Sequence, residues 1–244
     1  MVGSKKVKHQ LNRKINKADF KKIYKSDATV EEKLKYIHEN MFFNSNLKDK
    51  EIPEQLMSLM YIRPADKVLE IGGNAGRNTC VISCILKDES NLVTLESNPI
   101  TVKRLIENRD KNEFKFKIED SAISRIKLIQ LKMQTKPSDV LEEGWEWVKT
   151  ITWEDFKKKY DVKFNVLVAD CEGALYYILR DEPTFLDGIK TVIMENDFED
   201  KEHEDFVFNV FKENGFKIIY EKGIKNWQDK GINKNNFYVV LKRD

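Results

Sequence analysis

Three glycines and an acidic side chain mark the end of one apolar run in this sequence, "VLEIGGNAGRNT" at 68–79. A glycine-rich turn between a strand and a helix lets the backbone approach a bound nucleotide closely. Glu70 lies just before this turn, where its carboxylate would repel a pyrophosphate. It would suit a ligand with a cationic amino acid end and no phosphate. We therefore expect the turn to bind S-adenosylmethionine.

Acidic side chains also end the next two apolar runs. Glu96 ends "LVTLE", 20 residues after Gly76, where a carboxylate can accept hydrogen bonds from both ribose hydroxyls of an adenosine. The third run, "FKFKIED", places Asp120 or Ser121 where either could meet the adenine amino group. The carboxyl ends of parallel strands share one sheet edge, which is where such sheets bind ligands. The predicted cofactor-binding residues are Glu70, Gly72, Gly73, Asn74, Gly76, Asn78, Glu96, Ser97, Asp120, Ser121 and Asp170.

From residue 67 onward, strand-like and helix-like patterns alternate, which implies right-handed βαβ crossovers and a parallel sheet. Two last apolar runs, 216–223 and 236–244, suit a hairpin at the sheet edge. The prediction is an α/β fold of the Rossmann-like class I methyltransferase type. It has a mostly parallel seven-stranded sheet, a C-terminal antiparallel hairpin and helices on both faces. Strands are predicted at 67–72, 92–97, 114–120, 164–173 and 189–197, and helices at 30–42, 53–62, 76–87, 99–112, 153–161, 174–181 and 203–215.

Charge and pattern divide the chain into three parts. Residues 1–28 are a basic arm, weakly ordered or helical, and residues 29–62 form N-terminal helices. Residues 63–244 form the methyltransferase domain, with an insertion at 121–150 that combines one strand near 124–133 with an irregular segment. Residues 1–25 hold nine Lys or Arg against one acid, while the whole chain has a net charge of only +2. The body that follows the arm is therefore mildly acidic.

A resemblance to a known family covers about 66–197. This region resembles the FkbM-type methyltransferases in its order of features: the helix start "ITWEDF", a strand, and then Ala169-Asp170-Cys171-Glu172-Gly173-Ala174. The apolar strand that ends at Glu195 resembles that family too. Leu175 stands where that family has a second glutamate. The resemblance implies S-adenosylmethionine-dependent methylation of a hydroxyl on a sugar, glycan or other small acceptor. The segments "GGNAGRN", "LVTLE" and "DCEGALYYIL" are also similar to the sequences of relatives encoded by large DNA viruses.

Three carboxylates are the candidate catalytic residues. Asp170, at the end of the fourth predicted strand, is the most central, and we expect it to hold the amino end of the cofactor or the acceptor. Glu172 and Glu195 are expected to orient the acceptor or to act as the base that accepts its proton. Acidic side chains at one rim could also bind Mg²⁺, but no clear Asp…Asp-Asn ligand set is present, so a divalent metal is not favoured.

Two other functions stay open at this stage. The basic arm could grip a nucleic acid by counterion release, as in an RNA cap or ribose 2′-O methyltransferase. That chemistry needs a Lys-Asp-Lys-Glu tetrad. Asp170 can supply the aspartate, but the strand after it ends Glu195-Asn196-Asp197, with no lysine from there until Lys201. The second alternative is a non-catalytic scaffold that keeps the fold.

Segment composition sets expectations about location. The N-terminus has no apolar core of the signal-peptide kind, no apolar run is long enough to span a membrane, and the three cysteines suggest no disulfide framework. We expect an intracellular, cytoplasmic enzyme.

Overall fold

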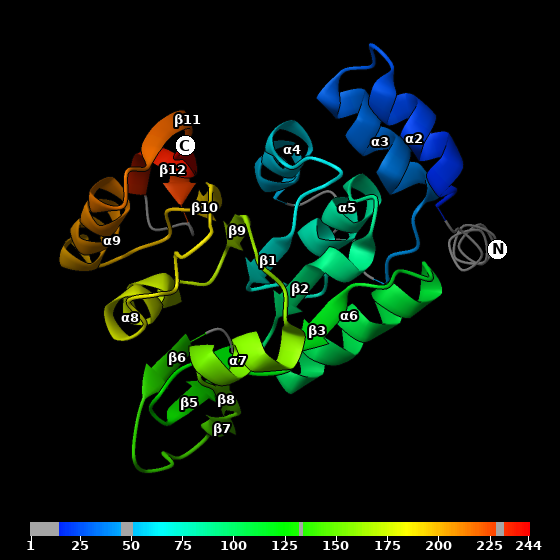
Figure 1. Cartoon of the computed structure of the whole chain (residues 1–244). Helices are drawn as coiled ribbons and strands as arrows, with labels where there is room; N and C mark the ends of the chain where they lie inside the picture. Colours follow the sequence, from blue (N-terminus) through cyan, green and yellow to red (C-terminus); the bar gives the residue numbers. More distant parts are fainter. Residues whose placement is uncertain (1–14, 45–50, 132–133, 228–231) are drawn as a thin grey trace.

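The computed structural model describes residues 15–44, 51–131, 134–227 and 232–244, and a seven-stranded sheet forms its centre (Figure 1). The strands are β1 (Val68–Ile71), β2 (Leu92–Leu95), β3 (Lys117–Glu119), β9 (Val166–Ala169), β10 (Thr191–Glu195), β11 (Lys217–Trp227) and β12 (Ile232–Lys242). They lie in the order β11-β12-β10-β9-β1-β2-β3, and only β12 pairs antiparallel with its neighbours. The predicted fold class, including the hairpin at the sheet edge, is confirmed.

Helices cover both faces of this sheet. They are α2 (Lys17–Lys25), α3 (Val30–Asn40), α4 (Ile52–Tyr61), α5 (Arg77–Ile85), α6 (Pro99–Lys111), α7 (Trp153–Tyr160), α8 (Ala174–Asp181) and α9 (Lys201–Glu213), with a 3-10 turn at Glu89–Asn91. Successive strand residues point to opposite faces, so Val68 joins a core with helices α2 to α6, while Leu69 joins a second core with α7 to α9. Within the described ranges, no helix is long and apolar enough to cross a membrane.

The N-terminal helices pack on the first face of the sheet. Helix α3 begins after Thr29, whose hydroxyl accepts a hydrogen bond from the Glu32 amide at 3.2 Å while the Glu32 carboxylate accepts from the Thr29 amide at 2.8 Å. Helix α2 forms inside the predicted basic arm and buries Phe20 against the ring of Tyr36. Residues 1–14 of that arm lie outside the described residues. The division of the chain at 28 and 62 stays a prediction.

The insertion at 121–150 is more regular than predicted. Strands β5 (Leu128–Leu131), β6 (Gln134–Pro137) and β7 (Glu146–Val148) form an antiparallel sheet, and β4 (Ala122–Ile123) pairs with β8 (Thr150–Ile151). The prediction of an irregular segment was wrong because β6, "QTKP", is polar and largely exposed, so it has no alternating apolar pattern. Its pairing with β5 alone identifies it as a strand.

Candidate functional site

A cavity of about 440 Å³ opens at the carboxyl edge of the sheet. This is where the strand order reverses between β1 and β9, which is the usual place for ligands in open α/β sheets. The cavity size is in the range of small-molecule sites. Its wall includes eight of the predicted site residues: Gly72, Asn74, Glu96, Ser97, Ser121, Asp170, Glu172 and Glu195.

The glycine turn after β1 packs directly on the end of β9. Gly72 has a φ of +86°, and a Cβ on it would lie 1.6 Å from the carbonyl oxygen of Asp170. The amides of Gly72 and Gly73 both donate to the carbonyl of Leu95, each at 3.0 Å. Only a residue without a side chain can bring these three strand ends so close together. Gly76, by contrast, serves as the N-cap of α5 and does not line the cavity.

Glu96 lies at the end of β2 and is held by backbone amides. Its Oε2 accepts a hydrogen bond from the Asn74 amide at 2.9 Å, and its Oε1 accepts from the Asn98 amide at 2.7 Å. Each carboxylate oxygen keeps further acceptor capacity, so a pair of ribose hydroxyls can still be bound. Burial raises the pKa of Glu96, and the amide hydrogen bonds oppose that rise.

Of the two candidates after β3, Ser121 lines the cavity and Asp120 does not. The Ser121 hydroxyl donates to Glu119 at 2.8 Å, whereas Asp120 is exposed and forms an ion pair with Lys149 at 2.5 Å. The geometry favours Ser121 as the residue nearer to an adenine ring.

Glu70 lies beneath the glycine turn rather than on the main cavity. It is 2% exposed, and its Oε2 accepts a hydrogen bond from the Thr79 hydroxyl at 2.5 Å, which ties β1 to α5. Burial raises its pKa to about 7. With Gly73 and Asn78 it borders a smaller cavity next to the main one.

Helix α4 brings two acidic side chains that were not among the predicted site residues. Glu51, the N-cap residue of α4, forms an ion pair with the buried Arg77, and Glu54 accepts a hydrogen bond from Asn78 at 2.9 Å. Ligand atoms of Glu51, Glu54 and Asp170 lie within 4.8 Å of one another, so these three could hold a cation. A signal was present: acids three residues apart at a helix start share one face.

Arg77 is the complementary charge at this end of the cavity. It begins α5, its side chain is 9% exposed, and its Nε is buried without a hydrogen-bond partner. A buried guanidinium that faces carboxylates presents both charges that a zwitterionic amino acid requires.

Four carboxylates gather at the ends of β9 and β10. Burial, followed by the charges of Asp170 and Glu51, raises the pKa of Glu195 to about 10. Burial, followed by the charge of Glu172, raises the pKa of Asp197 to about 7. The pKa of Asp170 is also raised, chiefly by burial and then by Asp197. Oε1 of Glu195 and Oδ2 of Asp197 are buried and make no hydrogen bond.

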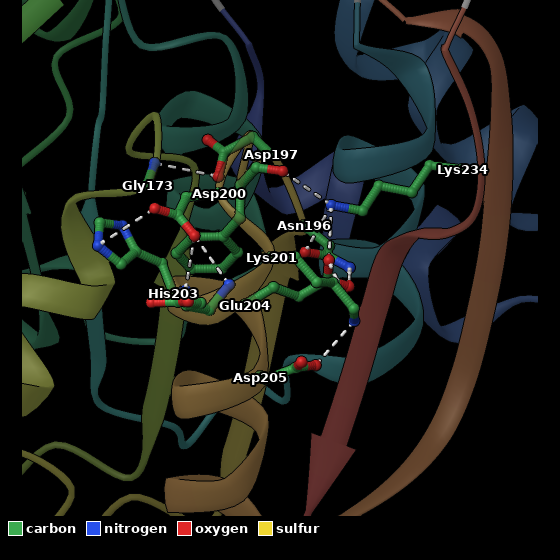
Figure 2. A network of polar contacts seen from close by, with 11 residues as sticks. Gly173, Asn196, Asp197, Asp200, Lys201, His203, Glu204, Asp205 and Lys234 are labelled. Atoms are coloured by element: carbon green, nitrogen blue, oxygen red, sulfur yellow. Dashed lines mark hydrogen bonds and ion pairs between the residues drawn. The ribbon is translucent and has the colours of Figure 1, made fainter.

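A polar network behind the cavity fixes the end of β10 (Figure 2). Asn196 is fully buried, and its Nδ2 donates to Glu204 at 2.7 Å. Lys234 from β12 donates to Asn196 Oδ1 and to the carbonyl of Phe198, each at 3.1 Å. The Gly173 amide donates to Asp197 Oδ1 at 3.1 Å, so one oxygen of Asp197 is held in place (Figure 2).

The family model for protein-L-isoaspartate(D-aspartate) O-methyltransferases matches residues 1–128, which is more than half of the chain. The chain belongs to this family. It is therefore an enzyme of the methyltransferase class. The matched part includes β1, β2 and β3, and it ends before β9 and β10.

The solved structures that this methyltransferase chain resembles show its fold. A provisionally assigned RNA methyltransferase from Pyrococcus horikoshii is 13% identical, with a TM-score of 0.50 over 100% of this chain and 99% of that one. An O-methyltransferase from Bacillus cereus in complex with S-adenosylhomocysteine is 10% identical, with a TM-score of 0.50 over 90% and 93%. No curated protein sequence matches the chain. The chain thus has the fold of S-adenosylmethionine-dependent methyltransferases, and the likeness leaves its acceptor open.

Proposed function

We propose that the enzyme transfers a methyl group from S-adenosylmethionine to a hydroxyl oxygen of a small acceptor, such as a sugar or glycan. One observation carries this proposal: residues at the ends of β1, β2, β9 and β10 line a single cavity at the switch point of the sheet. The family's name also specifies transfer to oxygen. The resemblance to FkbM-type enzymes, and to viral relatives, stays a prediction.

The polar side chains at the carboxyl edge of the sheet suit S-adenosylmethionine. Glu96 and Ser121 would hold the adenosine, with Asn74 and Ser97 beside them. Arg77, with its orphaned Nε, would bind the carboxylate of the amino acid end, and Glu51, Glu54 and Asp170 would take its ammonium group. The same three carboxylates could hold a metal, but the Arg77 guanidinium beside Glu51 suits a zwitterion better.

The bound cofactor supplies a methyl group on a cationic sulfur, so the sulfur–carbon bond breaks as the oxygen–carbon bond forms. The chain must then align the acceptor hydroxyl and accept its proton. Glu172, which follows β9 on the cavity wall, is placed for this, while Asp170 would hold the ammonium group of the cofactor.

The charge of the cavity opposes anionic acceptors. Within the described part of the chain, eight carboxylic side chains line the wall against Arg77 and Lys136. An RNA phosphate or the carboxylate of an isoaspartyl residue would be repelled there. The acceptor half of the cavity also lies outside the residues matched by the family model.

The test is transfer of an isotope-labelled methyl group from S-adenosylmethionine into separate pools of sugar metabolites, glycans and capped RNA. We expect label in the sugar or glycan pool, and none with Asp170→Ala. Label in RNA alone would contradict the proposal, and unchanged turnover in Asp170→Ala would remove Asp170 from the site. Absence of S-adenosylmethionine binding by calorimetry would support the scaffold alternative.

A further inference from the structure

Four of the eight acidic side chains on the cavity wall have ion-pair or backbone partners away from the ends of β9 and β10. Glu51 pairs with Arg77, Asp181 with Arg180 and Glu182 with Arg125, while backbone amides hold Glu96. Four further acids lie on the rim formed by β9 and β10, which is the half of the sheet away from the predicted adenosine site. They are Asp170, Glu172, Glu195 and Asp197.

The cofactor alone does not balance these charges. S-adenosylmethionine has a sulfonium, an ammonium and a carboxylate, so it brings a single net positive charge, and Asp170 lies at its amino end. Asp197 is 6% exposed, its Oδ2 has no hydrogen-bond partner, and it lines the cavity. Oε1 of Glu195 is likewise buried and unpartnered. Buried carboxylate oxygens without donors are costly, so they point to a ligand that supplies positive charge.

An aromatic ring lies beside Glu195. Glu195 on β10 is directly opposite Tyr238 on β12 in the antiparallel register, so their side chains project from the same face. Tyr238 lines the cavity and is 6% exposed, and Phe237 and Tyr177 line it too. Carboxylates next to aromatic faces are the features that bind an organic ammonium ion.

We propose that the acceptor is an amino alcohol or amino sugar whose protonated amine lies between Glu195, Asp197 and Tyr238. This inference rests on the proposed methyl transfer to a hydroxyl. A protonated amine has no lone pair, so the methyl group goes to the neighbouring hydroxyl near Asp170 and Glu172. The acidic pocket then selects among hydroxyl compounds by the charge of the group next to the hydroxyl.

A metal ion fits this rim less well than an ammonium group. Divalent cations need several oxygen ligands that converge on one point. Among the described residues, the one group of three that converges in this way is Glu51, Glu54 and Asp170, and neither Glu195 nor Asp197 belongs to it. An ammonium ion can donate hydrogen bonds to oxygens that lie farther apart, each at ordinary hydrogen-bond distance.

The experiment uses the whole protein loaded with S-adenosylhomocysteine, and matched acceptors that differ only in charge. Glucosamine is compared with glucose and N-acetylglucosamine, and ethanolamine with ethylene glycol, by calorimetry. Each is then tested for methylation with S-adenosylmethionine. We expect the amines to bind at least about tenfold more tightly than their neutral partners and to be methylated on oxygen. Equal affinities, no binding by either amine, or methylation on nitrogen would overturn the proposal.

Isosteric variants test whether the carboxylates of Glu195 and Asp197 bind the amine. Glu195→Gln and Asp197→Asn should each lose the preference for amines, while affinity for S-adenosylhomocysteine stays unchanged and so shows that the fold is intact. Asp205→Asn is the control, because Asp205 is an exposed acid on α9 that pairs with Lys201 away from the cavity. Retention of the preference in both site variants would contradict the assignment.

Two further outcomes separate this inference from the proposed function. If the wild-type chain does not bind S-adenosylhomocysteine, the proposed methyl transfer itself fails. If it binds the cofactor normally and methylates a neutral alcohol in preference to its amine partner, only the present inference fails. A requirement for Mg²⁺ that disappears in Glu195→Gln would show that the rim holds a metal instead.

Discussion

The carboxyl groups of Glu195 and Asp197 are held in an environment that opposes their charge. Burial and neighbouring carboxylates raise their pKa values to about 10 and about 7. In the ligand-free protein these groups bind protons that the unfolded chain has already lost. Their contribution to the free energy of unfolding is therefore fully present below their ordinary pKa values. It decreases as the pH rises, and it is lost once the pH has passed about 7 for Asp197 and about 10 for Glu195.

Replacement of Glu195 by glutamine tests this cost of charge. Above pH 4.5 the unfolded wild-type chain loses the Glu195 proton while the folded chain keeps it up to about pH 10. We expect Glu195→Gln to raise the free energy of unfolding at pH 8 by about 1–2 kcal/mol, and by less at pH 5. Urea denaturation at both pH values measures the difference. An equal effect at the two pH values would show that Glu195 is charged in the folded protein.

Arg77 is the residue we expect to hold the carboxylate of the cofactor. Its Nε lacks a partner, and its guanidinium faces Glu51. Arg77→Lys keeps the charge but loses the planar pair of donors, so we expect the Kd for S-adenosylmethionine to rise by about tenfold or more. Calorimetry of this variant, with the exposed Arg104→Lys as its control, measures the change. Unaltered affinity would place the amino acid end of the cofactor elsewhere.

Among the elements, the turn between β1 and α5 and the end of β9 act as a single packed unit. The amide of Asp170 donates to the carbonyl of Ile71 at 3.1 Å, and Gly72 touches the carbonyl of Asp170. Any displacement of the turn therefore moves the central carboxylate of the site.

Substitution of Gly72 tests this close contact. An alanine Cβ would overlap the Asp170 carbonyl, and the φ of +86° disfavours any side chain. We expect Gly72→Ala to lower the free energy of unfolding by about 1–3 kcal/mol and to weaken cofactor binding. Thermal unfolding of Gly144→Ala provides the matched control, because Gly144 has a similar φ of +79° but no atom within 4 Å. Equal losses in the two variants would mean that φ alone, and not the contact, sets the cost.

The glycine turn, the strand ends and most of the alternating elements were predictable, because hydrophobic period and glycine placement are local signals. Helix α8 has the predicted bounds, Ala174–Asp181. The sheet of β5, β6 and β7 was missed, because hydrogen bonds between distant segments define it. For the same reason Glu51 and Glu54 were not predicted as site residues: only the packing of α4 on α5 brings them to Asp170.

At the scale of the whole molecule, the charges are unevenly distributed. The first 25 residues are strongly basic, whereas the cavity is lined mainly by carboxylates. Helix α2, within that basic segment, is packed into the core through Phe20, and Lys17 pairs with Glu89. Within the described part of this segment, no residue from 15 to 25 lines the cavity.

Deletion of residues 1–14 tests whether the basic segment serves the reaction. These residues carry five Lys or Arg and precede α2. We expect the truncated protein to keep its turnover of a small acceptor and to lose most of any salt-dependent RNA retention. Filter binding of RNA at two salt concentrations and the labelled methyl assay measure the two effects. Loss of turnover on deletion would support the alternative in which RNA is the acceptor.

The amino-acid sequence by itself determined the class of fold and the kind of cofactor. Those properties depend on short-range patterns: apolar periodicity, a glycine turn, and acids at strand ends. The tertiary structure decided which carboxylates share one cavity and which are neutralised by arginines. It left one carboxylate oxygen each of Asp197 and Glu195 without a partner and placed Glu195 opposite Tyr238. Burial and the sum of neighbouring charges arise only when distant segments pack together, so the character of the acceptor pocket became visible only in the folded chain.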